Sequence, residues 1–187
     1  YSPAVLWSYV AQFENITNQY ELGEFIWRRD LIEEAVARLK DHAIVGFSTY
    51  IWNRSYNTVL ARELKKANPN ILILAGGPEY PIEKPYFFKT YPFIDICAKL
   101  EGEKSFKKIL EHFLTDKDYT SIPGLLINDN GKTIDTGDAV RIDDLDTIPS
   151  PYLTDIFKSL MEKHPEIRWN ATLETNRGCP YACTFCD

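Results

Sequence analysis

The sequence lacks any apolar run as long as the roughly 18 residues that a membrane-spanning helix needs, and no signal-peptide pattern opens it. It also lacks an excess of positive charge, because 21 Lys and Arg residues stand against 27 Asp and Glu residues, a net charge of −6. An acidic chain has no general attraction for nucleic acid or anionic lipid. We therefore expect a cytoplasmic protein whose partners include neither a membrane nor a nucleic acid.

Histidine is scarce, and internal repeats and low-complexity tracts are absent. The three histidines, His42, His112 and His164, are best explained as ordinary surface or helix-end residues. Hydrophobic residues make up 44% of the 187 residues, which is enough to build a core. The length suggests one domain and a piece of another.

Cysteine is sparse but concentrated at one end of the chain. Cys179, Cys183 and Cys186 have the spacing C-x-x-x-C-x-x-C, with Phe185 before the last of them. Three thiolates on so short a loop can hold three irons of a 4Fe–4S cluster and leave the fourth iron open to another ligand. A zinc site would want a fourth Cys or His at close spacing, and a disulfide would need an oxidising compartment. Cys97 stands in an apolar run, where we expect a small buried side chain.

Apolar runs and amphipathic segments alternate in the first two thirds of the chain. The runs at 43–48, 71–75 and 93–98 predict strands buried on both faces of a parallel sheet. Helical patterns follow or precede them at 31–40, 56–66 and 103–113. This alternation predicts an α/β fold with a doubly wound, Rossmann-like, mostly parallel sheet. Such a sheet normally has a strand before its first helix, so we expect an N-terminal strand to be missing from this chain.

The remaining third predicts a different organisation. Asn130-Gly131 between two apolar runs indicates a β-hairpin, and residues 143–151 form an acidic linker with two prolines. A strand is expected from Trp169, leading into the cysteine loop. We accordingly divide the chain into an α/β domain at 1–120, a hairpin and linker at 121–168, and the start of a further, truncated domain at 169–187.

In a doubly wound sheet, ligands bind outside the carboxyl ends of the strands. Hydroxyls, aromatic rings and glycines, which let a ligand approach the backbone, follow the predicted strands here. The candidate binding residues are Ser48, Thr49 and Tyr50 after the first strand, Gly76, Gly77 and Pro78 after the second, and Glu101 after the third. Taken loop by loop, tight turns and core aromatics are the better explanation of the same residues.

Three motifs in order, G-F-S-T-Y-I-W-N at 46–53, A-G-G-P at 75–78 and E-G-E at 101–103, precede the three-cysteine loop. Together they resemble the N-terminal part of the cobalamin-binding radical S-adenosylmethionine (radical SAM) family. The resemblance implies a cobalamin over the strand ends, with Ser48, Thr49, Gly76 and Gly77 lining the pocket of its tail and Glu101 near the rim. It implies a 4Fe–4S cluster on the three cysteines, with S-adenosylmethionine on the open iron.

Two residues qualify this resemblance. Many cobalamin domains supply a cobalt-ligating histidine from a D-x-H-x-x-G loop, but His42 stands one position early in 41–46, and that run enters a strand instead of leaving one. Arg177, two residues before Cys179, is a candidate charge neighbour of the cluster, and a structural or solvated arginine is an equal alternative.

The implied activity is that of a cobalamin-dependent radical SAM enzyme that transfers a methyl group to an unactivated position. Its partners would be a small-molecule or peptide substrate and a reducing protein such as flavodoxin or ferredoxin. The sequence identifies no catalytic residue, and we expect the truncated chain to be inactive by itself. Two alternatives stay open: a radical SAM enzyme whose α/β domain binds no cobalamin, and a non-catalytic corinoid-binding protein with an incidental metal loop.

Overall fold

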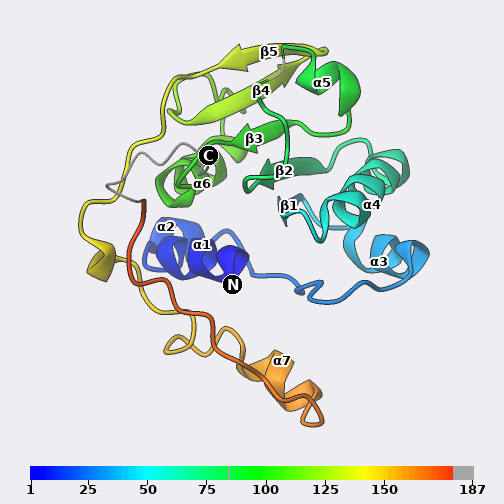
Figure 1. Cartoon of the computed structure of the whole chain (residues 1–187). Coiled ribbons are helices and arrows are strands. Elements are labelled where there is room, and N and C mark those ends of the chain that lie inside the picture. Colours follow the sequence, from blue (N-terminus) through cyan, green and yellow to red (C-terminus); the bar gives the residue numbers. More distant parts are fainter. Residues whose placement is uncertain (84, 179–187) are drawn as a thin grey trace, which may run out of the picture.

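A five-stranded mixed sheet forms the centre of the molecule in the computed structural model, which describes residues 1–83 and 85–178 (Figure 1). The strands lie side by side in chain order: β1 (Ile44–Ser48), β2 (Leu72–Gly76), β3 (Ile96–Ala98), β4 (Leu125–Asp129) and β5 (Lys132–Asp135). The pairings β1–β2 and β2–β3 are parallel, and β3–β4 and β4–β5 are antiparallel. The carboxyl ends of β1, β2 and β3 therefore meet at one edge of the sheet.

Helices cover both faces of the sheet (Figure 1). One face carries α3 (Ile32–Leu39) and α4 (Arg54–Ala67), which pack on Val45, Phe47, Ile73 and Ala75. We call it the α3–α4 face. The opposite face, here the α1–α6 face, carries α1 (Ser2–Val10) and α6 (Glu103–Phe113). Alternate residues of each strand point to the two faces, so side chains pack on both sides of these apolar runs, except at Gly46 of β1, which is exposed.

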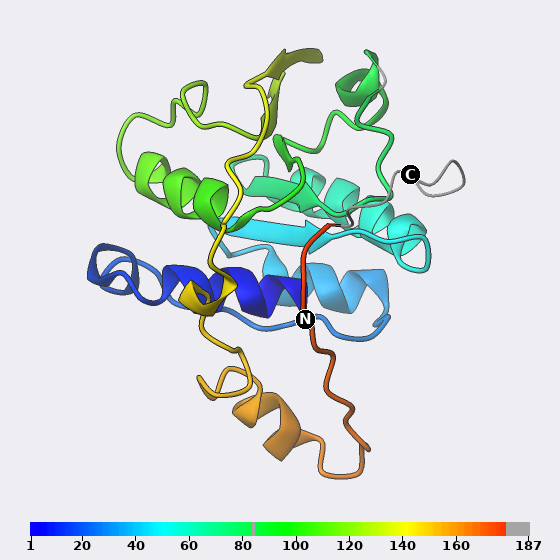
Figure 2. The same cartoon turned by 60° about the vertical axis from the view of Figure 1, so that its left-hand side comes forward.

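The other elements are short. They are α2 (Glu14–Thr17), α5 (Phe87–Thr90), a 3₁₀ turn at Leu145–Thr147 and α7 (Lys158–Lys163). After α7 the chain runs back past the N-terminus toward the sheet (Figure 2). Aromatic contacts hold this C-terminal arm, residues 150–178: the Trp27 ring lies 5.0 Å from Trp169 and 5.1 Å from His164, between ring centroids.

The α/β class is confirmed, but a mostly parallel sheet followed by a separate hairpin is wrong. The β4–β5 hairpin continues the sheet, so two of the four pairings among the described strands are antiparallel. The reason is burial. Leu125 packs into the core on one face and Leu126 into the core on the other, which makes β4 an inner strand that covers the edge of the three-residue β3.

The strand expected from Trp169 does not form among the described residues. Residues 169–176 have no regular secondary structure, and no neighbouring strand pairs with them in the part of the chain that the structure describes. Their backbone is held at Thr172, whose N–H donates to the Tyr152 hydroxyl at 2.8 Å and whose carbonyl accepts from that hydroxyl at 2.9 Å. A segment without a ladder partner is not a strand. In the described residues, no helix reaches the length and apolarity that a membrane crossing requires.

Cys97 is buried, as predicted, with 1% of its surface exposed. Burial raises the pKa of its thiol to about 12, since a thiolate has no solvation in the core. We therefore expect Cys97 to resist alkylation by iodoacetamide at pH 8 in the native protein and to react once the protein is unfolded. Peptide mapping by mass spectrometry separates Cys97 from the three C-terminal cysteines. Rapid native labelling of Cys97 would contradict its placement between the helices and the sheet.

Candidate functional site at the carboxyl edge of the parallel strands

The ends of β1 and β2 are joined through their backbones. The Thr49 N–H donates to the Gly76 carbonyl at 2.8 Å, and the Gly77 backbone has a φ of +97°. A Cβ added to Gly77 would lie 2.4 Å from the Thr49 carbonyl oxygen. Gly77 is therefore required by the contact between two strand ends, because no side chain fits there. The two loops form one rigid rim.

Small residues line the α1–α6 face just below this rim. Ser48 pairs with Gly76 across β1 and β2, and Gly76 lies against Ala98 of β3. A Cβ added to Gly76 would lie 4.0 Å from the Ala98 Cβ. One level down β1, Gly46 is exposed, and a Cβ built on it would meet no heavy atom within 4 Å. We call Gly46, Ser48, Gly76 and Ala98 the shelf. It is an open, shallow area of sheet where larger side chains would otherwise stand.

Two asparagines fix the loop that follows the shelf. Asn53 donates to the Ser48 carbonyl at 2.9 Å and accepts from the Tyr50 N–H at 2.7 Å. Asn57 donates to the same carbonyl at 3.2 Å and to the Thr49 hydroxyl at 3.1 Å. Thr49 is fully buried, so its hydroxyl packs inside the protein on the side of α4 and does not reach the shelf. Among the predicted residues of this loop, Ser48 and Tyr50 remain at the surface.

Aromatic rings flank the rim. The Tyr50 and Trp52 rings stack with centroids 4.7 Å apart and planes 3° apart, and Trp52 is 64% exposed. The Tyr50 hydroxyl lies 3.3 Å from the Ser2 hydroxyl at the start of α1. This stacked pair offers a flat apolar surface next to the shelf.

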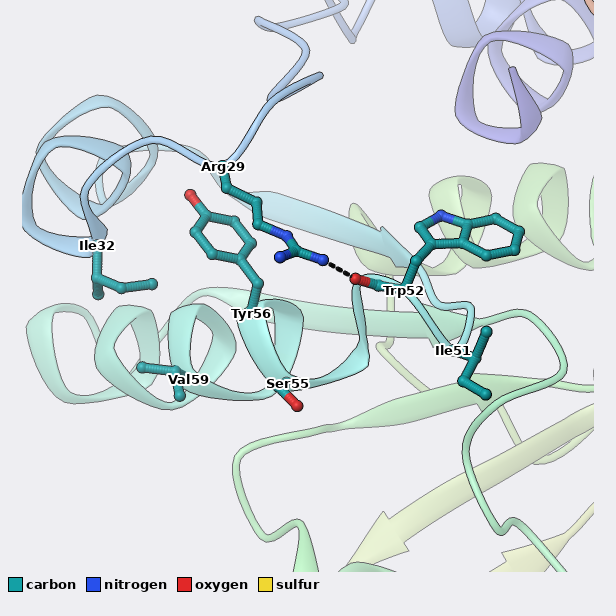
Figure 3. Close-up of a pocket in the computed structure, with 7 residues that line it drawn as sticks. All are labelled: Arg29, Ile32, Ile51, Trp52, Ser55, Tyr56 and Val59. Atoms are coloured by element: carbon teal, nitrogen blue, oxygen red, sulfur yellow. Dashed lines mark hydrogen bonds between the residues drawn. The ribbon is translucent and has the colours of Figure 1, made fainter.

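An open hollow of about 650 Å³ lies on the other side of the same loop (Figure 3). Arg29 donates a hydrogen bond to the Trp52 carbonyl there and ties the loop to the segment before α3. Side chains from the segment before α3, from α3 and α4 and from the loop line the hollow: Arg29, Ile32, Ile51, Trp52, Ser55, Tyr56 and Val59. The hollow thus borders the rim but is separate from the shelf.

The end of β3 carries a cluster of charges. Glu101 accepts from the Ile142 N–H at 2.9 Å, and Glu103, the first residue of α6, is only 4% exposed. Arg177 reaches both: Nη2 lies 2.5 Å from Glu103 Oε1, and Nη1 lies 3.6 Å from Glu101 Oε2. Its Nε lies 3.2 Å from Glu174. Burial alone would lower the pKa of Arg177, but the hydrogen bond to Glu103 and the surrounding carboxylates outweigh burial and raise it.

The predicted iron ligands Cys179, Cys183 and Cys186 lie outside the described residues. No group of three His, Cys, Asp or Glu residues that could hold a metal occurs in the described part of the chain. The described backbone ends at Gly178, next to the Arg177 cluster and therefore beside the end of β3.

The histidines are ordinary, as expected. His42 precedes β1, at the edge opposite the shelf, and its Nδ1 lies 3.2 Å from the Leu39 carbonyl at the end of α3. His112 and His164 lie at the ends of α6 and α7, with Nδ1 3.0 Å from Asp116 and 3.4 Å from Glu166 respectively. The chain therefore places no histidine at the carboxyl edge.

Two features of the site were not predicted. Gly46 and Ala98 belong to the shelf, and an isolated glycine inside an apolar strand is a signal that could have drawn attention to Gly46. The contact of Glu103 with Arg177 joins residues 74 positions apart, and nothing in local sequence pattern indicates such a pair. Gly77 and Pro78 are exposed on the rim, as a binding role would require, and Glu101 lies after the neighbouring strand β3.

No family model matches the chain. The sequence is 33% identical over 186 residues to the cobalamin-dependent radical SAM methyltransferase TokK of Streptomyces tokunonensis. It is 32% identical over 186 residues to the 2-(S-pantetheinyl)-carbapenam-3-carboxylate methyltransferase of Streptantibioticus cattleyicolor. Each match covers 98% of this chain and 27% of the relative. Among solved structures, the cobalamin-dependent S-adenosylmethionine radical enzyme OxsB, with aqua-cobalamin and S-adenosylmethionine bound, has a TM-score of 0.64 at 24% identity, over 83% of this chain and 21% of that one.

These likenesses show what the chain is related to. The structural match supports the α/β fold, and the sequence matches confirm the relationship that the motifs predicted. The chain is homologous to cobalamin-dependent radical SAM methyltransferases, and it spans 27% of the length of the relatives it matches.

Proposed function

We propose that this chain is the segment of a cobalamin-dependent radical SAM methyltransferase that carries the corinoid site and the cysteine loop. The observation that carries the proposal is the shelf, where a glycine inside a packed strand faces open space at the carboxyl edge of the sheet. Ligands of such sheets bind at this edge. The 33% identity to a cobalamin-dependent enzyme supports cobalamin as the ligand.

The residues at the shelf fit a large flat cofactor with a tail. Gly46 and Gly76 leave the sheet surface low, so that a ring system could lie against the backbone. Ser48 adds a hydroxyl at the same level, and the stacked Tyr50–Trp52 pair adds an apolar surface beside it. Glu101 would stand at the far end of the rim, held by Ile142. Gly77 and Thr49 would contribute by holding the rim in shape.

The cysteine loop has the donor atoms that an iron–sulfur cluster needs, because each cysteine can supply a thiolate. Cys179, Cys183 and Cys186 would each bind one iron as thiolates and leave the fourth iron for S-adenosylmethionine. When bound, the cluster and the cobalamin would supply the electron that cleaves S-adenosylmethionine and the carrier for its methyl group. The role of this chain is to hold both cofactors near one edge of the sheet. The substrate, a small molecule or a peptide, and the flavodoxin-like or ferredoxin-like electron donor belong to the same proposal.

Anaerobic reconstitution of the chain with iron, sulfide and hydroxocobalamin tests the proposal. We expect one corinoid and about four irons per chain, read from the absorption spectrum and from metal analysis. Replacing Cys183 with alanine should remove the cluster and leave the corinoid, because the two sites use different residues. The matched control is Cys97→Ala, which changes a buried cysteine of the sheet and should leave both cofactors in place.

Other outcomes would contradict the proposal in distinguishable ways. Cluster bands without corinoid bands would favour a radical SAM enzyme whose α/β domain binds no cobalamin. Corinoid bands without a cluster would favour a non-catalytic corinoid-binding protein. Equal loss of iron from the Cys183 and Cys97 variants would show that the three-cysteine loop is not the cluster site.

A further inference from the structure

The buried contact between Arg177 and Glu103 links the two parts of the chain that carry the proposed cofactors. Glu103 is 4% exposed, and the Arg177 side chain is 15% exposed. A charge at such a position is tolerated only when it is paired, because desolvation of a lone ion costs several kcal/mol. The pair therefore holds together strongly once both residues are buried.

The carboxylates around Arg177 are themselves fixed to the sheet domain. Glu103 begins α6, directly after β3, and α6 packs on the sheet through Ile109. Glu101 accepts the Ile142 N–H, which fixes it from the other side. Arg177 thus contacts a prebuilt acidic receptor at the end of β3. A planar guanidinium with several donors suits such a receptor better than an ammonium group does.

The arm has few other attachments near this point. Residues 170–176 are all exposed, and the contacts to their backbone are those of the Tyr152 hydroxyl with Thr172 and of the Tyr1 side chain with Glu174 among the described residues. Arg177 is the next residue along the arm that is partly buried. It lies two positions before Cys179, so its place decides where the cysteine loop begins.

We propose that Arg177 is a positioning residue: by binding Glu101 and Glu103 it fixes the start of the cysteine loop at the carboxyl end of β3. The consequence, which rests on the proposed function, is that this contact sets the separation between the cluster on the loop and the corinoid on the shelf. A merely solvated arginine would leave the loop free to adopt many positions relative to the sheet.

Hydrogen exchange in the chain without cofactors tests the contact itself. Arg177→Gln should raise the exchange rate of the Thr172 amide, whose hydrogen bond to Tyr152 holds the arm, by at least about tenfold, since local opening no longer has to break the Arg177–Glu103 pair. Arg168→Gln is the matched control, because Arg168 is an exposed arginine of the same arm. Arg177→Lys should give an intermediate exchange rate, because lysine keeps the positive charge but lacks the planar guanidinium with its several donors.

In the Arg177→Gln variant, the buried Glu103 carboxylate has lost its partner and could destabilise α6. A second variant therefore separates this effect from the loss of the contact. The double variant Arg177→Gln/Glu103→Gln removes both charges and should restore the stability of the sheet, while the Thr172 amide keeps its faster exchange. Rates in the Arg177 variants no higher than in Arg168→Gln would overturn the proposal.

Magnetic coupling in the reconstituted protein tests the consequence. In the wild type, the reduced cluster and cob(II)alamin should show one defined dipolar splitting in the electron paramagnetic resonance spectrum, and in the double variant a broad distribution. The same sharp splitting in the double variant would overturn the positioning role, even if hydrogen exchange in the arm of that variant were faster. A wild type that binds neither cofactor would refute the proposed function and the cofactor separation, while the exchange rates would still decide whether Arg177 fixes the arm.

Discussion

Replacing Gly46 with valine should weaken cobalamin binding and leave the fold at least as stable as before. The two effects separate because Gly46 lies inside β1, yet its missing side chain would meet no atom of the protein. Valine favours strand geometry, and removing a glycine from a strand stabilises by roughly 0.5–1 kcal/mol. The isopropyl group would fill the shelf where we place the cofactor.

The expected loss of affinity is large. Forcing extra methyl groups into an occupied space costs about 1–3 kcal/mol, which corresponds to a roughly 5- to 200-fold rise in the dissociation constant of hydroxocobalamin. Equilibrium dialysis with a thermal melt of the same samples measures both effects. Thr133→Val on β5 is the matched control, because it introduces valine in the same sheet, at a position whose buried hydroxyl has no hydrogen-bond partner in the described structure. Unchanged affinity in Gly46→Val would exclude the shelf as the corinoid site.

Replacing Gly77 with alanine should destabilise the whole sheet. The φ of +97° is strained for any residue with a side chain, at a cost of about 1–3 kcal/mol. The new Cβ would also lie 2.4 Å from the Thr49 carbonyl oxygen and 2.8 Å from its nitrogen, so the rim would have to open. Such a loss is a large share of the stability of a single domain.

Gly76→Ala is the matched control for this prediction. An ideal Cβ on Gly76 meets its nearest atom at 3.9 Å, an ordinary contact, and its φ is not positive. Urea denaturation should show a lower midpoint for Gly77→Ala and little change for Gly76→Ala. Equal midpoints for the two variants would mean that the rim does not depend on the contact between Gly77 and Thr49.

Continuous apolar runs predicted β1 and β2 closely and β3 only in part, because the run at 93–98 forms a strand only at Ile96–Ala98. The runs at 43–48 and 71–75 became β1 and β2 within one residue, and 103–113 became α6 with the same bounds. These elements are buried on one or both sides, so their hydrophobic pattern records their structure directly. The hairpin was predicted from Asn130-Gly131, but its place in the sheet was not, because local pattern does not say which strand edge a hairpin covers.

The candidate site was predicted as a location and less well as a set of side chains. Ser48 and Gly76 lie on the shelf, whereas Thr49 is buried, since neighbouring residues at a strand end point to opposite faces. The sequence left two interpretations of Arg177, a charge neighbour of the cluster and a structural or solvated arginine, and the structure pairs it with Glu103. That pair depends on the path of the arm, which no short motif encodes.

Hydrogen exchange with and without hydroxocobalamin tests the central claim most directly, because it reports where the cofactor lies. We predict slower exchange on binding at residues 44–50, 74–80 and 96–101, where the three parallel strands end, and no change at residues 125–135 of the hairpin. Saturating hydroxocobalamin that leaves all three strand ends unprotected, or that protects the hairpin instead, would contradict the account.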